Sequence, residues 1–187
     1  MAIIDHSRGL LLAAIGGVAI TVDIPLIRLA DGNPGTILLL RSATTLVATL
    51  AIWLAWRWWR GDAPPLVPGR IGLVVAGLYG AGSVFFVLAV HNTSTANLVF
   101  ILALNTMFAA LLGWAFLGER PSLGTIAAMV IMLIGLLIIV GDGVGTGHIL
   151  GDLFSLASAF LMASAITITR ASGRDMGFAA LVAVALP

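Results

Sequence analysis

The sequence predicts an all-α polytopic membrane protein, and three observations point to this class. Of its 187 residues, 60% are hydrophobic. Only 9% are charged, whereas about a quarter of a soluble domain is charged. Apolar runs of about 20 residues, the length that crosses a bilayer as a helix, alternate with short segments rich in Gly and Pro.

Six apolar runs are long enough to span a bilayer. We expect helices at 9–27, 34–56, 71–90, 95–117, 122–140 and 150–169. The segments between them hold turn-forming residues: ADGNPG (30–35), RGDAPPLVPGR (60–70), HNTST (91–95), GERPS (118–122), GDGVGTGH (141–148) and RASGRDMG (170–177). A partial helix begins near Gly177 and reaches Pro187, which is too short to cross a bilayer. We therefore expect the chain to be truncated, as a part of a longer protein.

The arginines predict the orientation of the chain. If the N-terminus is cytoplasmic, the predicted helices leave only Arg28 on the outer side and Arg41 within the membrane. The cytoplasmic side then holds Arg8, Arg57, Arg60, Arg70, Arg120, Arg170 and Arg174. Because cytoplasmic loops carry an excess of basic residues, we expect a cytoplasmic N-terminus. Four tryptophans at the cytoplasmic end of the second helix, Trp53, Trp56, Trp58 and Trp59, predict an aromatic belt at the interface.

Composition also excludes several kinds of site. A net charge of +1 argues against nucleic acid as a partner. The absence of Cys excludes thiolate chemistry and cysteine metal sites. The three histidines are scattered at positions 6, 91 and 148, which makes a histidine metal site unexpected. We expect no metal and no cofactor, and partners limited to the lipid bilayer and a small-molecule substrate.

Two segments of the chain are similar to each other. GLLLAAIGGVAITVDIPLIR (9–28) and GDLFSLASAFLMASAITITR (151–170) both begin with Gly and end with Arg, 19 residues apart. Five predicted helices lie between the two starts, and an odd number places the second copy in the opposite orientation. Inverted repeats of this kind are typical of secondary transporters.

Residues 88–122 resemble the drug/metabolite transporter superfamily, EamA type. Their sequence is LAVHNTSTANLVFILALNTMFAALLGWAFLGERPS. The resemblance lies at the junction of the third and fourth helices and at the LGE-R turn. The arginine within the second helix also fits this resemblance. The resemblance implies a bundle of two inverted five-helix repeats. Residues 1–142 would form the first repeat, and residues 148–187 the start of the second. It further implies an exporter of small metabolites, amino acids among them, in the inner membrane.

Arg41 is the first candidate site residue. It lies seven residues after Pro34, roughly 10 Å from the outer end of the helix. An arginine at a helix centre costs about 2.5–3.5 kcal/mol on insertion scales. Asp23 of the first helix is expected at a comparable depth, so the two residues can form a buried clamp between helices. Alternatively, Arg41 anchors a substrate carboxylate while Asp23 acts as a competing counter-ion or proton acceptor.

Further candidates lie nearby. Pro25 removes a backbone hydrogen bond and should bend the first helix, either as a hinge or only as a packing adjustment. Asn97 and Asn105 share a face of the fourth helix, which Thr93 extends, and can line a polar cavity or bond to other helices. His91, at the outer end of the third helix, can titrate near neutral pH or be a solvated loop residue.

Three functions fit these features. The first is a secondary transporter that exports small metabolites, including amino acids, by alternating access. The second is an intramembrane enzyme of the rhomboid serine protease type, although YGAGSVFF matches the required serine motif poorly. The third is a structural membrane protein without transport. We favour the transporter, and we expect the protein not to be an enzyme.

Overall fold

The protein is helical throughout the part that the structure describes. The computed structural model describes residues 22–30, 32–61, 67, 69–146 and 148–173, and it contains no strand among them. The chain divides into two compact units, residues 1–33 and 34–187. In the first unit, residues 22–29 are helical and include Asp23 and Pro25.

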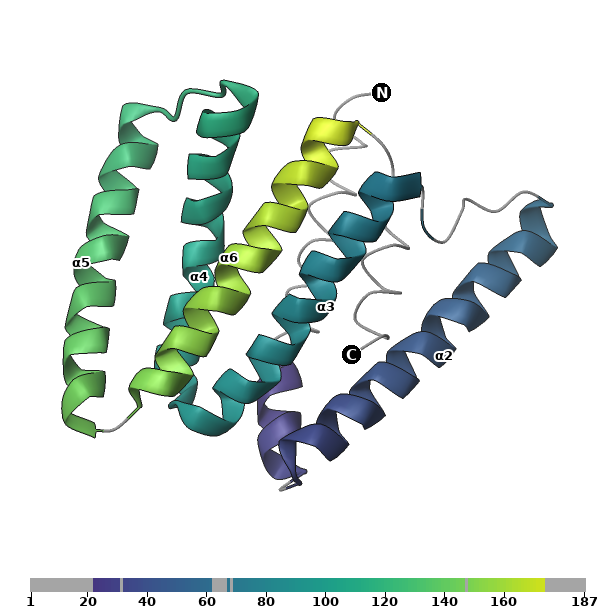
Figure 1. The fold of residues 1–187 in the computed structure, drawn as a ribbon, viewed down its shortest axis with the longest axis horizontal. Helices are drawn as coiled ribbons and strands as arrows, with labels where there is room; N and C mark the ends of the chain where they lie inside the picture. The colour runs from purple at the N-terminus through teal and green to yellow at the C-terminus, as the bar shows by residue number, and fades with distance from the viewer. Residues whose placement is uncertain (1–21, 31, 62–66, 68, 147, 174–187) are drawn as a thin grey trace. The chain divides into compact units, whose positions relative to one another are not determined.

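The described residues of the second unit form five long helices (Figure 1). They are α2 (Pro34–Arg60), α3 (Gly69–Asn92), α4 (Thr95–Leu112), α5 (Leu123–Thr146) and α6 (Ile149–Ser172). A short π-helix, η1 (Gly113–Leu117), continues α4. Figure 1 shows α6 between α3 and α4, and its contacts with these two helices are the most extensive in the unit.

Small residues allow α6 to lie close to its neighbours. Ala159, Ala163 and Ala165 are fully buried. Val75 of α3 packs against Ala165, and Leu78, Tyr79 and Ile168 surround this contact. A second cluster joins Ile101, Leu104 and Met107 of α4 to Met129 of α5. Close approach of backbones at small residues is the usual way in which membrane helices associate.

The observed helices agree with most of the predicted turns. HNTST forms a two-residue connection, in which the Ser94 side chain accepts a hydrogen bond from the Asn97 backbone N–H at 3.2 Å and caps α4. Gly118 ends η1 with a φ of 73°, a left-handed conformation that glycine adopts without strain. The helices extend beyond the predicted bounds, to Arg60 in α2 and to Ser172 in α6.

One predicted turn is wrong. We expected GDGVGTGH (141–148) to be a turn, but α5 remains helical to Thr146. Each glycine weakens a helix by about 1 kcal/mol relative to alanine. Each added residue nevertheless extends the existing hydrogen-bond ladder of α5 without a new nucleation cost, which favours continuation of the helix.

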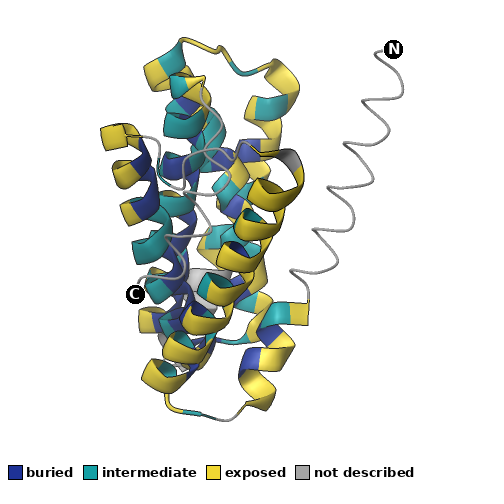
Figure 2. Cartoon of the chain, turned by 90° about the vertical axis from the view of Figure 1, so that its right-hand side faces the viewer, coloured by how far each residue is buried: buried dark blue, intermediate teal, exposed yellow. Residues whose placement is uncertain are grey.

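The surface of this unit is apolar, as expected for a membrane protein. Four described helices are long and apolar enough to cross a membrane, at 34–59, 69–92, 95–117 and 149–172, while α5 contributes a shorter apolar stretch, Leu123–Ile138. Large hydrophobic side chains such as Leu73, Ile131 and Leu137 are exposed. Figure 2 shows exposed residues along the outer faces of the helices. These observations confirm the all-α polytopic membrane class.

Candidate functional site

Arg41 lies against an aromatic ring of the neighbouring helix. Its guanidinium carbon is 4.9 Å from the centroid of the Phe86 ring on α3. Phe86 is buried, whereas Arg41 is half-buried. A cation over an aromatic face is stabilised by the ring quadrupole, by about 2 kcal/mol when the pair is desolvated. This contact therefore offsets part of the cost of placing a permanent cation in α2.

Arg57 makes a similar contact elsewhere on α2. Its guanidinium carbon is 5.4 Å from the centroid of the Trp53 ring on the same helix, and Arg57 is exposed. Trp58 and Trp59, at the same end of α2, are also exposed. Their exposure agrees with the predicted interfacial belt, because interfacial tryptophans contact lipid headgroups and not the protein core.

The predicted partner of Arg41 lies in the other unit. Asp23 and Pro25 belong to residues 1–33, whereas Arg41 belongs to residues 34–187. The Asp23–Arg41 pair and the hinge at Pro25 therefore stay predictions.

The predicted polar face of α4 is interrupted by an apolar residue. Asn97 and Asn105 are half-buried, but Ile101 between them is fully buried and packs in the cluster with Leu104 and Met129. The Asn105 Oδ1 atom is buried and has no hydrogen-bond partner among the described residues. The cavity-lining role of the two asparagines stays a prediction, and Asn105 is the stronger candidate, since buried amide oxygens normally accept hydrogen bonds.

Thr93 is part of a buried junction and not of α4 itself. It lies in the turn between α3 and α4, where its Oγ1 donates a hydrogen bond of 2.6 Å to Oδ1 of Asp152 in the first turn of α6. Thr93 is 4% exposed and Asp152 3% exposed. Asp152 Oδ2 is also buried and has no hydrogen-bond partner among the described residues.

Gly151 brings the backbones together at this junction. A Cβ atom added there would collide with the carbonyl group of Asn92, and it would lie 2.5 Å from the Thr93 backbone nitrogen. Nearby, Ser155 Oγ donates a hydrogen bond of 2.8 Å to the Gly151 carbonyl oxygen. We call the contact among Asn92, Thr93, Gly151 and Asp152 the Thr93–Asp152 junction.

His91 lies next to this junction but on the surface. It is exposed, and its Nδ1 is 2.9 Å from the carbonyl oxygen of Val87 on the same helix. The substrate-binding role of His91 stays a prediction, and so does the alternative of a solvated residue.

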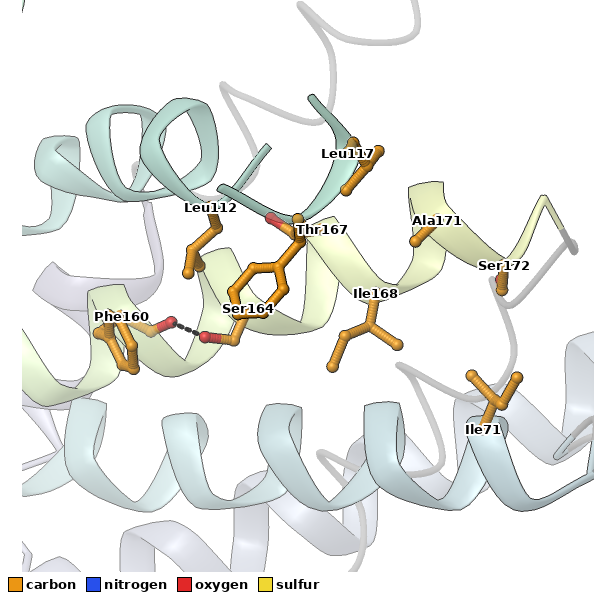
Figure 3. Close-up of a pocket in the computed structure, with 10 residues that line it drawn as sticks. Ile71, Leu112, Leu117, Phe160, Ser164, Thr167, Ile168, Ala171 and Ser172 are labelled. Carbon is orange, nitrogen blue, oxygen red and sulfur yellow. Dashed lines mark hydrogen bonds between the residues drawn. The ribbon is translucent and has the colours of Figure 1, made fainter. Parts of the chain in front are cut away.

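The opposite end of the bundle, where α3 begins and α4 and α6 end, holds a groove and three arginines. We call it the arginine end, after Arg70, Arg120 and Arg170. The groove has a volume of about 590 Å³ and runs along α6, with Ile71 of α3 on one side and Leu112 of α4 on the other (Figure 3). Its lining is almost entirely apolar. The hydroxyls of Ser164 and Thr167 donate hydrogen bonds of 2.8 Å and 2.9 Å to carbonyl oxygens of their own helix.

An ion pair connects the arginine end of α6 to the turn after η1. Arg170 Nη2 is 2.6 Å from Glu119 Oε2, and both side chains are about half exposed, at 49% and 50%. A Cβ atom on Gly113 would lie 3.3 Å from the same carboxylate oxygen, so Gly113 leaves room for it. The LGE-R turn therefore holds the end of α6 beside the end of η1.

Two residues of these sites were not predicted from the sequence. Phe86 looks like any other apolar residue of α3, and only its position over Arg41 distinguishes it. Asp152 could have been singled out, because it is an ionisable residue within a predicted spanning segment, and such residues are functional candidates by default. No group of three or more metal-binding side chains occurs among the described residues.

Comparison with known proteins gives one result. The model of the EamA-like transporter family matches residues 7–141, which is most of the chain. No curated protein and no solved structure gives a significant match.

Proposed function

Because the chain belongs to the EamA-like transporter family, we propose that it is a secondary transporter that exports small metabolites, amino acids among them, by alternating access. Its apolar helices and its family make it a multi-pass membrane protein. We further propose that it resides in the inner membrane with the N-terminus in the cytoplasm. The arginine end would then face the cytoplasm, in agreement with the excess of basic residues on cytoplasmic sides.

The observation that carries this proposal is the cation of Arg41 in a membrane-spanning helix. The Phe86 ring stabilises the guanidinium charge through its quadrupole. A guanidinium that keeps its charge can bind a substrate carboxylate through two parallel hydrogen bonds. Amino acids and other small organic acids carry the group that this site would recognise.

The test is solute counterflow in proteoliposomes. The purified chain is reconstituted into vesicles, and the vesicles are loaded with one unlabelled solute from a panel of amino acids and metabolites. Uptake of the same solute in labelled form is then measured. We expect counterflow of at least one carboxylate-bearing solute. Arg41→Ala should abolish it, and Arg41→Lys should retain only part of it, because an ammonium group lacks the bidentate geometry of guanidinium.

Arg57→Ala is the matched control. Arg57 lies on the same helix and also contacts an aromatic ring, but it is exposed near the end of α2. We expect this variant to retain counterflow. If no solute of the panel exchanges in well-folded wild-type protein, or if Arg41→Ala and Arg57→Ala behave alike, the proposal is wrong in this form.

The clamp alternative for Arg41 has its own test. If Asp23 and Arg41 only hold two helices together, the exchanged pair Asp23→Arg with Arg41→Asp should restore the flux that each single variant loses. If Arg41 binds substrate, the exchanged pair should stay inactive although the protein folds.

A further inference from the structure

The groove at the arginine end has the length of one half of a bilayer. Its lining residues on α6 run from Phe160 to Ser172, which is roughly 18 Å along a helix that rises 1.5 Å per residue. The hydrocarbon core of a bilayer is about 30 Å thick, so one leaflet contributes about 15 Å. A groove that starts at the arginine end therefore reaches about as far as the acyl chain of one lipid.

The lining of the groove suits an apolar occupant. Ile71, Phe116 and Phe160 present exposed apolar surface there. The hydroxyl protons of Ser164 and Thr167 are used in hydrogen bonds to carbonyl oxygens of their own helix, and Figure 3 shows the Ser164 hydroxyl turned toward the Phe160 carbonyl. The volume of about 590 Å³ lies within the range of about 300–1,000 Å³ that is usual for ligand pockets. If nothing filled this volume, the lining atoms would lose their dispersion contacts.

An acyl chain alone would give the groove no preference among lipids. Lipid tails are as apolar as the side chains of a membrane helix, so transfer of a chain from the bilayer into the groove gains little from the hydrophobic effect. Any selectivity must therefore come from the groups that meet the headgroup, at the end of the groove that lies at the membrane interface.

Two exposed arginines lie at that end. Arg70 immediately precedes the lining residue of α3, and Arg120 lies three residues after Leu117 of η1. Both are exposed, and neither forms an ion pair with a described residue. Arg170, in contrast, is paired with Glu119. The described part of the arginine end therefore keeps the positive charges of Arg70 and Arg120, which are complementary to an anionic headgroup.

We propose that the groove binds an acyl chain of an anionic phospholipid, whose headgroup phosphate pairs with Arg70 and Arg120. Guanidinium groups bind phosphate oxygens through parallel hydrogen bonds. Basic sites between membrane helices are suited to the headgroups of anionic lipids. The bound lipid fills the space among α3, η1 and α6. This inference goes beyond the proposed transport function and does not depend on it.

The first test compares three probes on the wild-type chain. Native mass spectrometry of the chain in detergent measures the binding of phosphatidylglycerol, of phosphatidylcholine with the same acyl chains, and of glycerol 3-phosphate. We expect phosphatidylglycerol to bind at least about tenfold more tightly than phosphatidylcholine, because its net negative charge is attracted by two arginines. Glycerol 3-phosphate should not bind, because it has no acyl chain. Equal binding of the two lipids, or binding of glycerol 3-phosphate alone, overturns the inference.

Arginine variants test the headgroup contact. Arg70→Gln and Arg120→Gln should each lower the affinity for phosphatidylglycerol by about fivefold and leave the affinity for phosphatidylcholine unchanged. Arg57→Gln is the matched control, because Arg57 is also exposed but lies on α2, which does not line the groove. If Arg57→Gln lowers the affinity as much as the other two variants do, the attraction is not specific to the groove and the inference is overturned.

A groove-filling variant tests the acyl-chain contact. Ala171 lines the groove and is exposed, so Ala171→Phe fills the groove without overpacking the core. It should weaken the binding of both phospholipids by at least about tenfold, which corresponds to about 1.4 kcal/mol. Ala127→Phe, at an exposed position of α5 outside the groove, should bind both as the wild type does. If Ala171→Phe binds lipid normally, or if it instead dissociates a lipid-free dimer in which a second copy covers the groove, the inference is overturned.

Discussion

Three helical glycines of α3 and α6, which differ in how closely other elements approach them, predict a graded series of stability effects. A Cβ atom on Gly151 would collide with backbone atoms of Asn92 and lie 2.5 Å from the Thr93 nitrogen. A Cβ atom on Gly82 would lie 3.3 Å from Cγ of Met162, which is a flexible side chain that can move aside. A Cβ atom on Gly77 would have no neighbour within 4 Å.

The three alanine variants differ mainly in this steric term. Each replaces a helical glycine, so the gain in helix propensity of about 1 kcal/mol is similar in all three and cancels in the comparison. Overpacking costs about 1–3 kcal/mol, and the upper end applies to Gly151 because backbone has to move. We expect Gly151→Ala to be less stable than Gly77→Ala by about 1–3 kcal/mol, with Gly82→Ala between them.

Thermal unfolding in detergent measures the series. At about 2–4 °C per kcal/mol for a chain of this size, Gly151→Ala should melt roughly 2–12 °C below Gly77→Ala. Loss of monodisperse protein on heating, followed by fluorescence-detected size exclusion, gives the order of the variants. If Gly151→Ala melts at the same temperature as Gly77→Ala, α6 does not approach the α3–α4 turn as described, and the argument about the Thr93–Asp152 junction is refuted with it.

Two further variants test the contacts of Arg41 and Arg170. Phe86→Leu removes the ring and should destabilise the protein by about 2 kcal/mol beyond Phe86→Tyr, which keeps an aromatic face; equal melting temperatures would contradict the cation–π contact. Glu119→Gln combined with Arg170→Gln should show a coupling energy below about 1 kcal/mol in a double-mutant cycle, because both partners are half exposed. A markedly larger coupling would show that the ion pair is shielded from solvent.

The sequence predicts the helices of this protein better than their ends. Apolar runs and turn residues identify α2 to α6, because a bilayer requires about 20 apolar residues for each span. GDGVGT misleads because glycine is ordinarily a turn signal, whereas here the residues extend a helix that is already formed. At the end of η1, the Glu119 backbone N–H donates a hydrogen bond to the Gly113 carbonyl oxygen. No residue pattern in the sequence predicts this hydrogen bond.

The candidate sites depend on contacts between residues that are distant in sequence. The hydrogen bond from Thr93 to Asp152 spans 59 residues. Thr93 was singled out as an extension of the α4 face, but its burial comes from α6. Residue type alone identifies Arg41 and Asp152 as ionisable residues within spanning segments. Which residues they contact, Phe86 and Thr93, is decided by how α3 and the turn after it pack against α2 and α6.

The two ends of α6 differ in how firmly they are held. At the arginine end, a half-exposed ion pair contributes at most about 1 kcal/mol, and an apolar groove separates the surrounding side chains. At the other end, a buried hydrogen bond and a backbone contact at Gly151 fix the first turn. We therefore expect displacement of α6 to cost less at the arginine end than at the Thr93–Asp152 junction. Any rearrangement that opens this end would have to break the buried Thr93–Asp152 hydrogen bond and separate the backbones that meet at Gly151.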